Sequence, residues 1–200
     1  MTSDPAPTLA EKRKKNQDIK AKVRRQMLQR MPKGGICVEV GVWRGEFTRM
    51  LLNQLQPDKM ILIDPWKNFD ERTDAFDGQT KDQEFEDIYN SVRAKYASEI
   101  DAGQLEVKRG LSGDVLKDMT AESLSFIYLD GDHSYEGVKA DLAAALPLMK
   151  TGGIIMMDDY HRRGWWGDGV IRAANEFIGD NADAVRIWAM RGAQLAIEKL

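Results

Sequence analysis

The sequence predicts an α/β protein: a three-layer sandwich in which a mostly parallel, seven-stranded sheet ends in a C-terminal antiparallel hairpin. Two observations support this prediction. Short apolar runs rich in β-branched residues alternate with longer segments whose apolar residues have helical spacing, which is typical of a parallel sheet covered by helices on both faces. At the C-terminal end, two strand-like runs are separated only by a short turn, which indicates a hairpin.

The composition fits one soluble domain with attachments. Two hundred residues are enough for one sizeable core, and 42% hydrophobic with 30% charged residues is ordinary for a globular protein. No apolar run approaches the roughly 20 residues that span a bilayer, and the N-terminal residues lack the apolar stretch of a signal peptide. We therefore expect a cytoplasmic protein without a membrane span, whose single cysteine, Cys37, is a small buried hydrophobe.

The N-terminal region is predicted to be a tail followed by a basic helix. Residues 1–8 contain two prolines and should be disordered, whereas residues 9–33 are rich in helix formers until a proline and two glycines end the segment. Nine basic residues stand against two acidic ones between positions 11 and 30, so we expect a basic, solvated face, with contact to RNA, a membrane or an acidic partner as the alternatives. The apolar positions, which form one narrow stripe that can lie on the domain, are Ile19, Val23, Met27 and Met31.

Residues 34–200 are expected to form the α/β domain. The polar stretch at about 66–98 is too long for a plain connection, so we expect a helix at 81–97 and a lid-like insertion in the remainder. Helical spacing also marks residues 46–56 and the segment after the fourth strand. The predicted strands occupy residues 35–40, 59–64, 104–110, 124–130 and 152–159, and the hairpin pairs residues 183–190 with 193–200.

The loop after the first strand is a candidate cofactor-binding loop, because ligands bind at the carboxyl ends of the strands of an open parallel sheet. Gly41 and Gly45 let the backbone turn tightly before a helix N-terminus. Glu39 would repel a phosphate there and suits a cation, and the loop lacks the glycine spacing of nicotinamide binders. Asp64 ends the second strand, where a carboxylate can accept hydrogen bonds from two ribose hydroxyls. The alternative for Asp64 is a turn residue before proline.

These motifs resemble those of class I S-adenosylmethionine-dependent methyltransferases, in particular a branch of metal-dependent sugar and natural-product O-methyltransferases. The resemblance extends from Gly35 to about Tyr160 and rests together on VEVGVWRGEF, ILIDPW, RGLSGD, FIYLDGDHSYEGVKADL and GGIIMMDDY. It implies a Rossmann-like fold and S-adenosylmethionine as the cofactor, with Trp66 packed on the adenine, on the substrate or in a lid. The residues that it assigns to the cofactor are Glu39, Gly41 and Gly45 for the methionine end, Asp64 for the ribose, Ser112 for the adenine edge, and Asp130.

Three carboxylates are predicted to meet beside the methyl donor. Asp130 ends the fourth strand, Asp158 and Asp159 end the fifth, and these strands are neighbours in the class I sheet. Unpaired carboxylates would repel one another, and Mg²⁺ or another divalent cation relieves this repulsion because it prefers hard oxygen ligands. The resemblance implies the same metal ligands. An ion pair of Asp159 with a following arginine is the structural alternative.

His133 is the candidate base, acting with Asp130. Methyl transfer to a hydroxyl requires removal of the hydroxyl proton, and a histidine with a pKa near neutrality suits this task. The resemblance supports the assignment, because some sugar methyltransferases have histidine at this position; a capping or hydrogen-bonding role is the alternative. The acceptor is expected to be a small molecule with a sugar, natural-product or phenol hydroxyl. Its candidate contacts are Trp66, Tyr160, His161, Trp165 and Trp166.

Two other functions stay open at this point. Asp130, His133 and His161 have the composition of a non-haem Fe(II) hydroxylase site, although such sites usually lie on all-β barrels. A non-catalytic binding protein would act through the basic N-terminal helix. If the methyltransferase interpretation is right, removal of residues 1–32 should spare methyl transfer. With a net charge of −3, nucleic acid is not the expected partner, and the N-terminal helix and the hairpin offer surfaces for a homo-oligomer.

Overall fold

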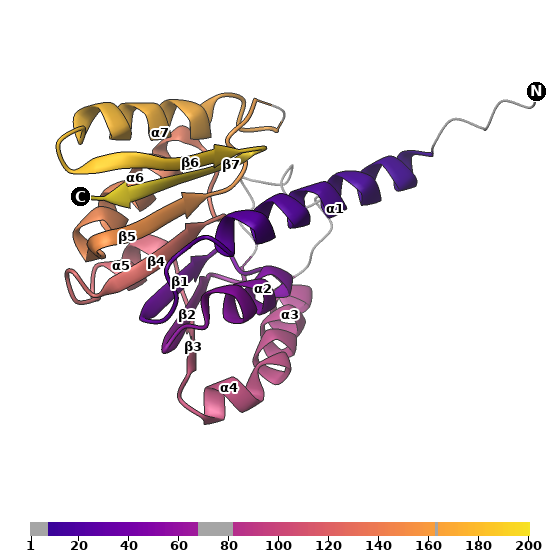
Figure 1. The fold of residues 1–200 in the computed structure, drawn as a ribbon. Helices are drawn as coiled ribbons and strands as arrows, with labels where there is room; N and C mark the ends of the chain where they lie inside the picture. Colours follow the sequence, from indigo (N-terminus) through magenta and orange to yellow (C-terminus); the bar gives the residue numbers. More distant parts are fainter. Residues whose placement is uncertain (1–7, 68–81, 163) are drawn as a thin grey trace, which may run out of the picture.

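The computed structural model describes residues 8–67, 82–162 and 164–200. Seven strands form one sheet in the order β3-β2-β1-β4-β5-β7-β6 (Figure 1). Strands β1 to β5 are parallel, and β7 runs antiparallel to both β5 and β6. The strand order reverses between β1 and β4, which is where sheets of this kind bind ligands. The strands are β1 (Ile36–Val40), β2 (Lys59–Asp64), β3 (Leu105–Arg109), β4 (Leu124–Leu129), β5 (Met149–Met157), β6 (Val185–Arg191) and β7 (Gln194–Lys199).

Helices cover both faces of this sheet, as Figure 1 shows. One face carries α1, α2 and α3, and the other carries α5, α6 and α7, so the predicted three-layer α/β sandwich is confirmed. The helices are α1 (Leu9–Leu28), α2 (Glu46–Leu55), α3 (Asp82–Lys95), α4 (Ala97–Asp101), α5 (Ser112–Leu116), α6 (Tyr135–Ala145) and α7 (Gly169–Asp180).

Most predicted elements agree with the observed ones to within a few residues, but the N-terminal helix, expected over residues 9–33, ends at Leu28. The fifth strand begins at Met149 rather than at residue 152, and it passes through Gly152 and Gly153. A Cβ on Gly153 would lie 3.0 Å from the carbonyl oxygen of Leu124 in β4, so the glycine allows a close approach of two strands instead of starting a turn.

The predicted lid-like insertion is only partly described. Residues 68–81 lie outside the described residues, as do residues 1–7 of the predicted tail. The remainder of the insertion forms α3, which packs on the sheet through Phe85, Ile88 and Val92. This part of the insertion therefore contributes to the core.

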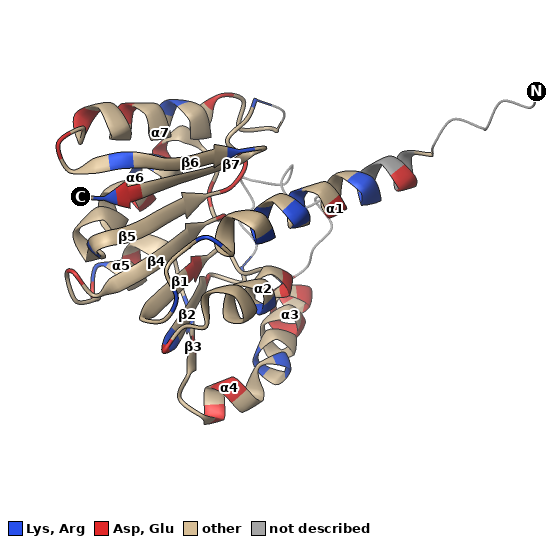
Figure 2. Ribbon diagram, in the orientation of Figure 1, with Lys and Arg blue, Asp and Glu red and all other residues tan. Residues whose placement is uncertain are grey.

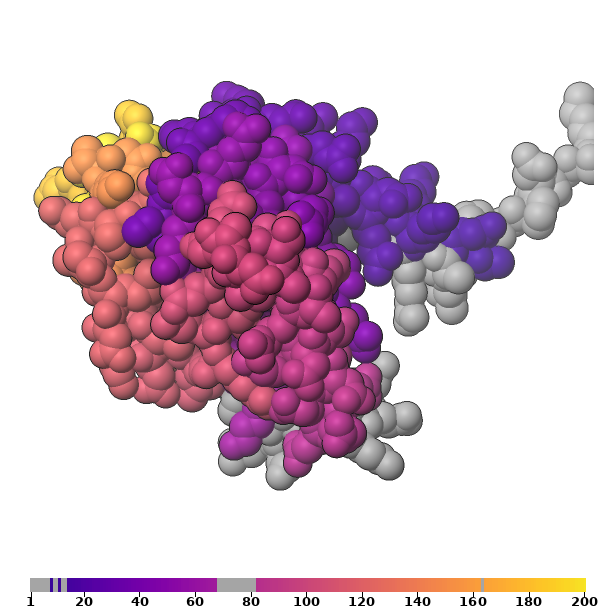
Figure 3. Space-filling view, turned by 90° about the horizontal axis from the view of Figure 1, so that it is seen from below, coloured from indigo at the N-terminus to yellow at the C-terminus, as the bar shows by residue number. Residues whose placement is uncertain are grey.

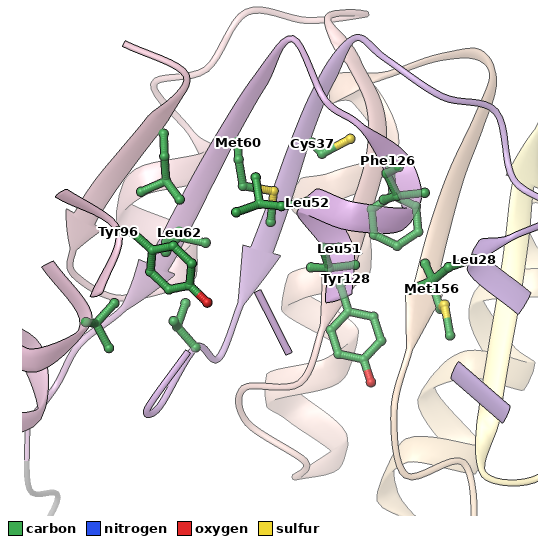
Figure 4. Packing of buried hydrophobic residues seen from close by; sticks show 14 of the residues in the cluster. Leu28, Cys37, Leu51, Leu52, Met60, Leu62, Tyr96, Phe126, Tyr128 and Met156 are labelled. Carbon is green, nitrogen blue, oxygen red and sulfur yellow. The ribbon is translucent and has the colours of Figure 1, made fainter. Parts of the chain in front are cut away.

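The sheet divides the buried side chains into two clusters, and the alternation along β1 directs one carboxylate toward the helices. Cys37 points to the cluster beneath α1, α2 and α3, which Figure 4 shows with Tyr96 and Tyr128. Val38 and Val40 point to the opposite cluster. Because neighbouring side chains of a strand alternate, Glu39 lies on the same face as Cys37 and reaches Thr48 of α2.

Helix α1 is only half attached to the domain. Met27, Leu28 and Met31 near its C-terminal end are buried, whereas Ile19, predicted to belong to the buried stripe, is 51% exposed. The N-terminal part of α1 projects from the body of the molecule (Figures 1 and 3). Within the described residues, no helix has the length and apolar character that crossing a membrane requires.

Candidate functional site

The loop between β1 and α2 lies against the end of β4. Gly41 has a φ of 84°, and a Cβ at this position would lie 2.1 Å from the carbonyl oxygen of Asp130. Gly45, with a φ of 69°, precedes the first turn of α2, and its carbonyl accepts a hydrogen bond from the Tyr96 hydroxyl. The two glycines thus let the loop join β1, β4 and the N-terminus of α2 at one point.

Glu39 is a buried carboxyl group beneath this loop. Its side chain is 1% exposed and accepts a hydrogen bond of 2.6 Å from the Thr48 hydroxyl. Burial raises the pKa of Glu39 to about 8, although the bond from Thr48 opposes this rise. At neutral pH, Glu39 of the ligand-free protein is therefore largely uncharged, and a cation placed beside it would favour the carboxylate.

Asp64 at the end of β2 organises the same loop. It accepts backbone hydrogen bonds of 2.9 Å from both Val42 and Trp43, and one of 2.7 Å from Trp66. Burial raises the pKa of Asp64, and these N–H groups oppose the rise. A carboxylate has about four acceptor sites. Three backbone donors therefore leave Asp64 with about one acceptor site.

Two of the predicted cofactor or substrate residues have structural partners. Trp66 is 1% exposed, its ring lies 5.1 Å from that of Tyr89, and its indole N–H donates to the Trp43 carbonyl. Ser112 begins α5 and donates its hydroxyl proton to Asp141 of α6. Burial raises the pKa of Asp141 to about 6. Trp66 thus fills the core beneath the loop, and Ser112 connects two helices.

The ends of β4 and β5 bring acidic side chains and a histidine together. Asp130, His133 and Asp159 offer ligand atoms that all lie within 4.8 Å of one another. His133 Nε2 lies 3.4 Å from Asp130 Oδ1 and 3.5 Å from Asp159 Oδ2. Asp158 is only 2% exposed and shares the guanidinium group of Arg24 with Asp130. We call Asp130, His133, Asp158 and Asp159 the acidic cluster.

His133 has a defined orientation in this cluster. Its Nδ1 lies 3.0 Å from the carbonyl oxygen of Gly131, so Nδ1 carries the proton of that hydrogen bond and Nε2 is the basic nitrogen. Nε2 is buried and has no hydrogen-bond partner among the described residues. Burial alone would lower the pKa of His133, but Asp130, Asp159 and Asp158 together raise it above its ordinary value.

Two basic residues of α1 reach into the acidic cluster, which the sequence did not predict. Lys20 Nζ lies 2.5 Å from Asp158 Oδ2 and 2.9 Å from Asp159 Oδ1. Arg24 contacts Asp158 and lies 3.2 Å from Asp130 Oδ2. Figure 2 shows the basic residues of α1 and the acidic residues at the neighbouring strand ends. Part of the face expected to be solvated is thus paired with carboxylates of the same chain.

Asp158 is the most fully neutralised carboxylate of the cluster. Besides Lys20 and Arg24, it accepts a hydrogen bond from the Gln194 side chain of β7. Gln194 in turn accepts one of 3.0 Å from the Tyr128 hydroxyl. Burial alone would raise the pKa of Asp158, but the two cations outweigh it and lower this pKa. In Asp130, by contrast, burial and the neighbouring Asp158 charge raise the pKa.

Of the predicted acceptor residues, His161 and Trp166 lie beside this cluster. The Trp166 ring centroid is 4.8 Å from that of His133 and 5.5 Å from that of His161. The indole N–H of Trp166 donates to the His161 carbonyl, and His161 Nε2 lies 3.5 Å from Asp159 Oδ1. Trp165 is 48% exposed. The Tyr160 hydroxyl donates a hydrogen bond of 2.8 Å to Asn175 Oδ1 of α7.

Comparison with known proteins identifies the family. The family model of a methyltransferase domain matches residues 38–160, which is more than half of the chain. The chain therefore belongs to this methyltransferase family. A search of curated proteins found no match.

Solved structures share the fold at low sequence identity. The O-methyltransferase NovP is 19% identical, with a TM-score of 0.58 over 92% of this chain and 78% of that one. The TDP-rhamnose 3′-O-methyltransferase CalS11 of calicheamicin biosynthesis is 17% identical, with a TM-score of 0.58 over 91% and 80%. An rRNA methylase from Streptococcus thermophilus is 13% identical, with a TM-score of 0.56 over 88% and 94%. The likeness confirms the predicted fold and says nothing of the acceptor.

Proposed function

We propose that the protein transfers a methyl group from S-adenosylmethionine to a hydroxyl of a small molecule, such as a sugar, a natural product or a phenol, with the help of Mg²⁺ or a similar cation. The observation that supports this most strongly is the meeting of the β1 loop with Asp130, His133 and Asp159 at the strand ends. A methyl donor in the loop would thus lie beside groups that can bind and deprotonate an acceptor.

The residues around the loop suit a cationic cofactor. When bound, S-adenosylmethionine supplies a methyl group on a positively charged sulfur. Glu39 is buried, and the hydrogen bond that it accepts comes from the neutral Thr48 hydroxyl, so an amino group beside it would form a buried charge pair. Asp64 keeps about one acceptor site for a ribose hydroxyl. The proposed cofactor residues are Glu39, Gly41, Gly45, Asp64, Ser112 and Asp130.

The acidic cluster suits a divalent cation. Carboxylate oxygens are the ligands that Mg²⁺ prefers, and Asp130 and Asp159 present theirs within reach of one another. A bound cation would lower the pKa of an acceptor hydroxyl. Asp158 as a third ligand stays a prediction, because its carboxylate is engaged by Lys20, Arg24 and Gln194 in this structure.

His133 is proposed as the base. The Gly131 carbonyl fixes the imidazole ring through Nδ1, and the buried Nε2 makes no hydrogen bond within the described residues, so this nitrogen can accept the acceptor's proton. The imidazolium that forms would be stabilised by Asp130 and Asp159, whose oxygens lie 3.4 and 3.5 Å away. Trp165 and Trp166, with His161, offer flat apolar faces for the acceptor's ring.

Neither alternative function gains support. The described residues group His133 with Asp130 and Asp159 rather than with His161, and the methyltransferase family supports a transferase over a hydroxylase. The basic helix is less available to RNA than its sequence indicates, because Lys20 and Arg24 pair with the chain's own carboxylates.

Calorimetric titration with S-adenosylmethionine, followed by methyl-transfer assays on a panel of sugars and phenols with Mg²⁺ or with EDTA, tests the proposal. We expect donor binding, and acceptor methylation that EDTA abolishes. Asp159→Asn should lose the Mg²⁺ dependence together with activity, whereas Asp118→Asn, at an exposed position, should resemble the wild type. Absence of donor binding would overturn the proposal, and EDTA-resistant activity would overturn only the metal.

A further inference from the structure

We propose that Lys20 is a displaceable internal cation of the active site: its ammonium group neutralises the acidic cluster in the metal-free protein and leaves Asp159 when a divalent cation binds, while Arg24 stays in place. This inference rests on the proposed metal. It assigns to α1 a part in the active site, although the basic charge of this helix was expected to face solvent.

The two cations of α1 are held very differently. The Arg24 side chain is 14% exposed, and its guanidinium carbon lies 4.5 Å from the centre of the Phe47 ring and 5.4 Å from that of Tyr128. It is thus fixed by ring stacking as well as by Asp130 and Asp158. The Lys20 side chain is 36% exposed and is held by its carboxylate contacts. Movement of the Lys20 ammonium group would therefore break fewer contacts than movement of the Arg24 guanidinium group.

The position of Lys20 conflicts with a cation at the acidic cluster. Lys20 Nζ is 2.9 Å from Asp159 Oδ1, and the other oxygen of that carboxylate, Oδ2, is the one that faces His133 Nε2 at 3.5 Å. A divalent cation bound among Asp130, His133 and Asp159 would share the Asp159 carboxylate with the ammonium group. Like charges separated by one carboxylate in a half-buried site repel strongly, so the two cations compete.

The position of Lys20 on α1 allows its ammonium group to leave the acidic cluster. The helix packs on the domain through Met27, Leu28 and Met31, about two to three turns beyond Lys20, while residues 14–19 are exposed and project from the body (Figure 3). The lysine side chain carries its ammonium group on a flexible stem of four carbons. The ammonium can therefore swing into solvent, or the projecting part of α1 can bend away, without exposing the core.

The affinity for Mn²⁺, measured by calorimetry on the full chain, tests the competition. Lys20→Met, which keeps the length of the stem, and Lys20→Gln should each bind Mn²⁺ at least about tenfold more tightly than the wild type, because a neighbouring positive charge is removed. Lys22→Met is the matched control, since Lys22 is exposed on the same helix and should leave the affinity unchanged.

Equal or weaker Mn²⁺ binding by both Lys20 variants would overturn the inference and leave the metal in place. Absence of Mn²⁺ binding in the wild type and in all variants, with donor binding intact, would overturn the inference and the metal together. Absence of donor binding would instead contradict the methyltransferase proposal, so the three failures are distinguishable.

Discussion

Binding of S-adenosylmethionine is expected to tighten about tenfold for each unit that the pH rises from about 5.5 to about 7. The cause is Glu39, whose buried carboxyl has a pKa of about 8 in the ligand-free protein. If the cofactor's amino group requires the carboxylate, the bound state must release the Glu39 proton. Each unit between the pH and this pKa costs about 1.4 kcal/mol, so at pH 6 the cost is about 3 kcal/mol, or about a hundredfold in affinity.

Calorimetric titration at several pH values measures this slope, and Glu39→Gln removes it. Glutamine keeps an acceptor for the Thr48 hydroxyl and carries no titrating proton, so its affinity should match that of the wild type at about pH 5.5 and fall behind as the pH rises. Glu46→Gln, at an exposed position in the first turn of α2, is the control and should keep the slope. A wild-type affinity that is flat in this range, or a slope that survives in Glu39→Gln, would refute the role of Glu39.

Three further outcomes are expected. Gly41→Ala should lower the free energy of unfolding by more than about 3 kcal/mol in a denaturant titration, because its Cβ would overlap the backbone of Asp130 at a φ of 84°. Gly103→Ala, with a φ of 72° and open space around it, should cost only about 1–2 kcal/mol of backbone strain, and equal losses would contradict the clash. Arg24→Met should cost about 3 kcal/mol by leaving Asp158 buried without its main partner, and a variant as stable as the wild type would show that Lys20 and Gln194 suffice. His133→Ala should reduce kcat by about 10²–10⁴-fold with donor and Mn²⁺ affinity retained, whereas lost Mn²⁺ affinity would make His133 a ligand instead of the base.

The sheet was predictable because its signals are local. The run at 59–64 is apolar and ends in an aspartate before proline, and β2 has those bounds. Alternation of strands and helices implied parallel pairing, and the short turn at the C-terminal end implied the hairpin of β6 and β7. The start of β5 was missed since Gly152 and Gly153 usually indicate a turn, and the close approach of Gly153 to β4 is a contact between strands that no local signal reveals.

Within the site, only the residues that directly follow a strand could be placed from the sequence. Asp130 and Asp159 follow neighbouring strands, so topology alone brings them together. Side-chain partners depend on the whole fold: nothing near Trp66 in the sequence indicates that its ring fills the core against Tyr89. The sequence contained a weak indication that Lys20 and Arg24 face the domain. Their spacing of four places them on one helix face that continues to Leu28, which is buried.

These contacts change what a truncation of α1 can show. Removal of residues 1–32, expected from the sequence to spare methyl transfer, would take away Met27, Leu28 and Met31, which are 3%, 0% and 4% exposed. It would also leave Asp158 buried without Arg24 and Lys20. Loss of activity would then follow from an exposed core and an unpaired charge, even if α1 never touches the acceptor. Substitution of Lys20 leaves the buried part of the helix intact, so it can separate the contribution of α1 to the site from its contribution to the fold.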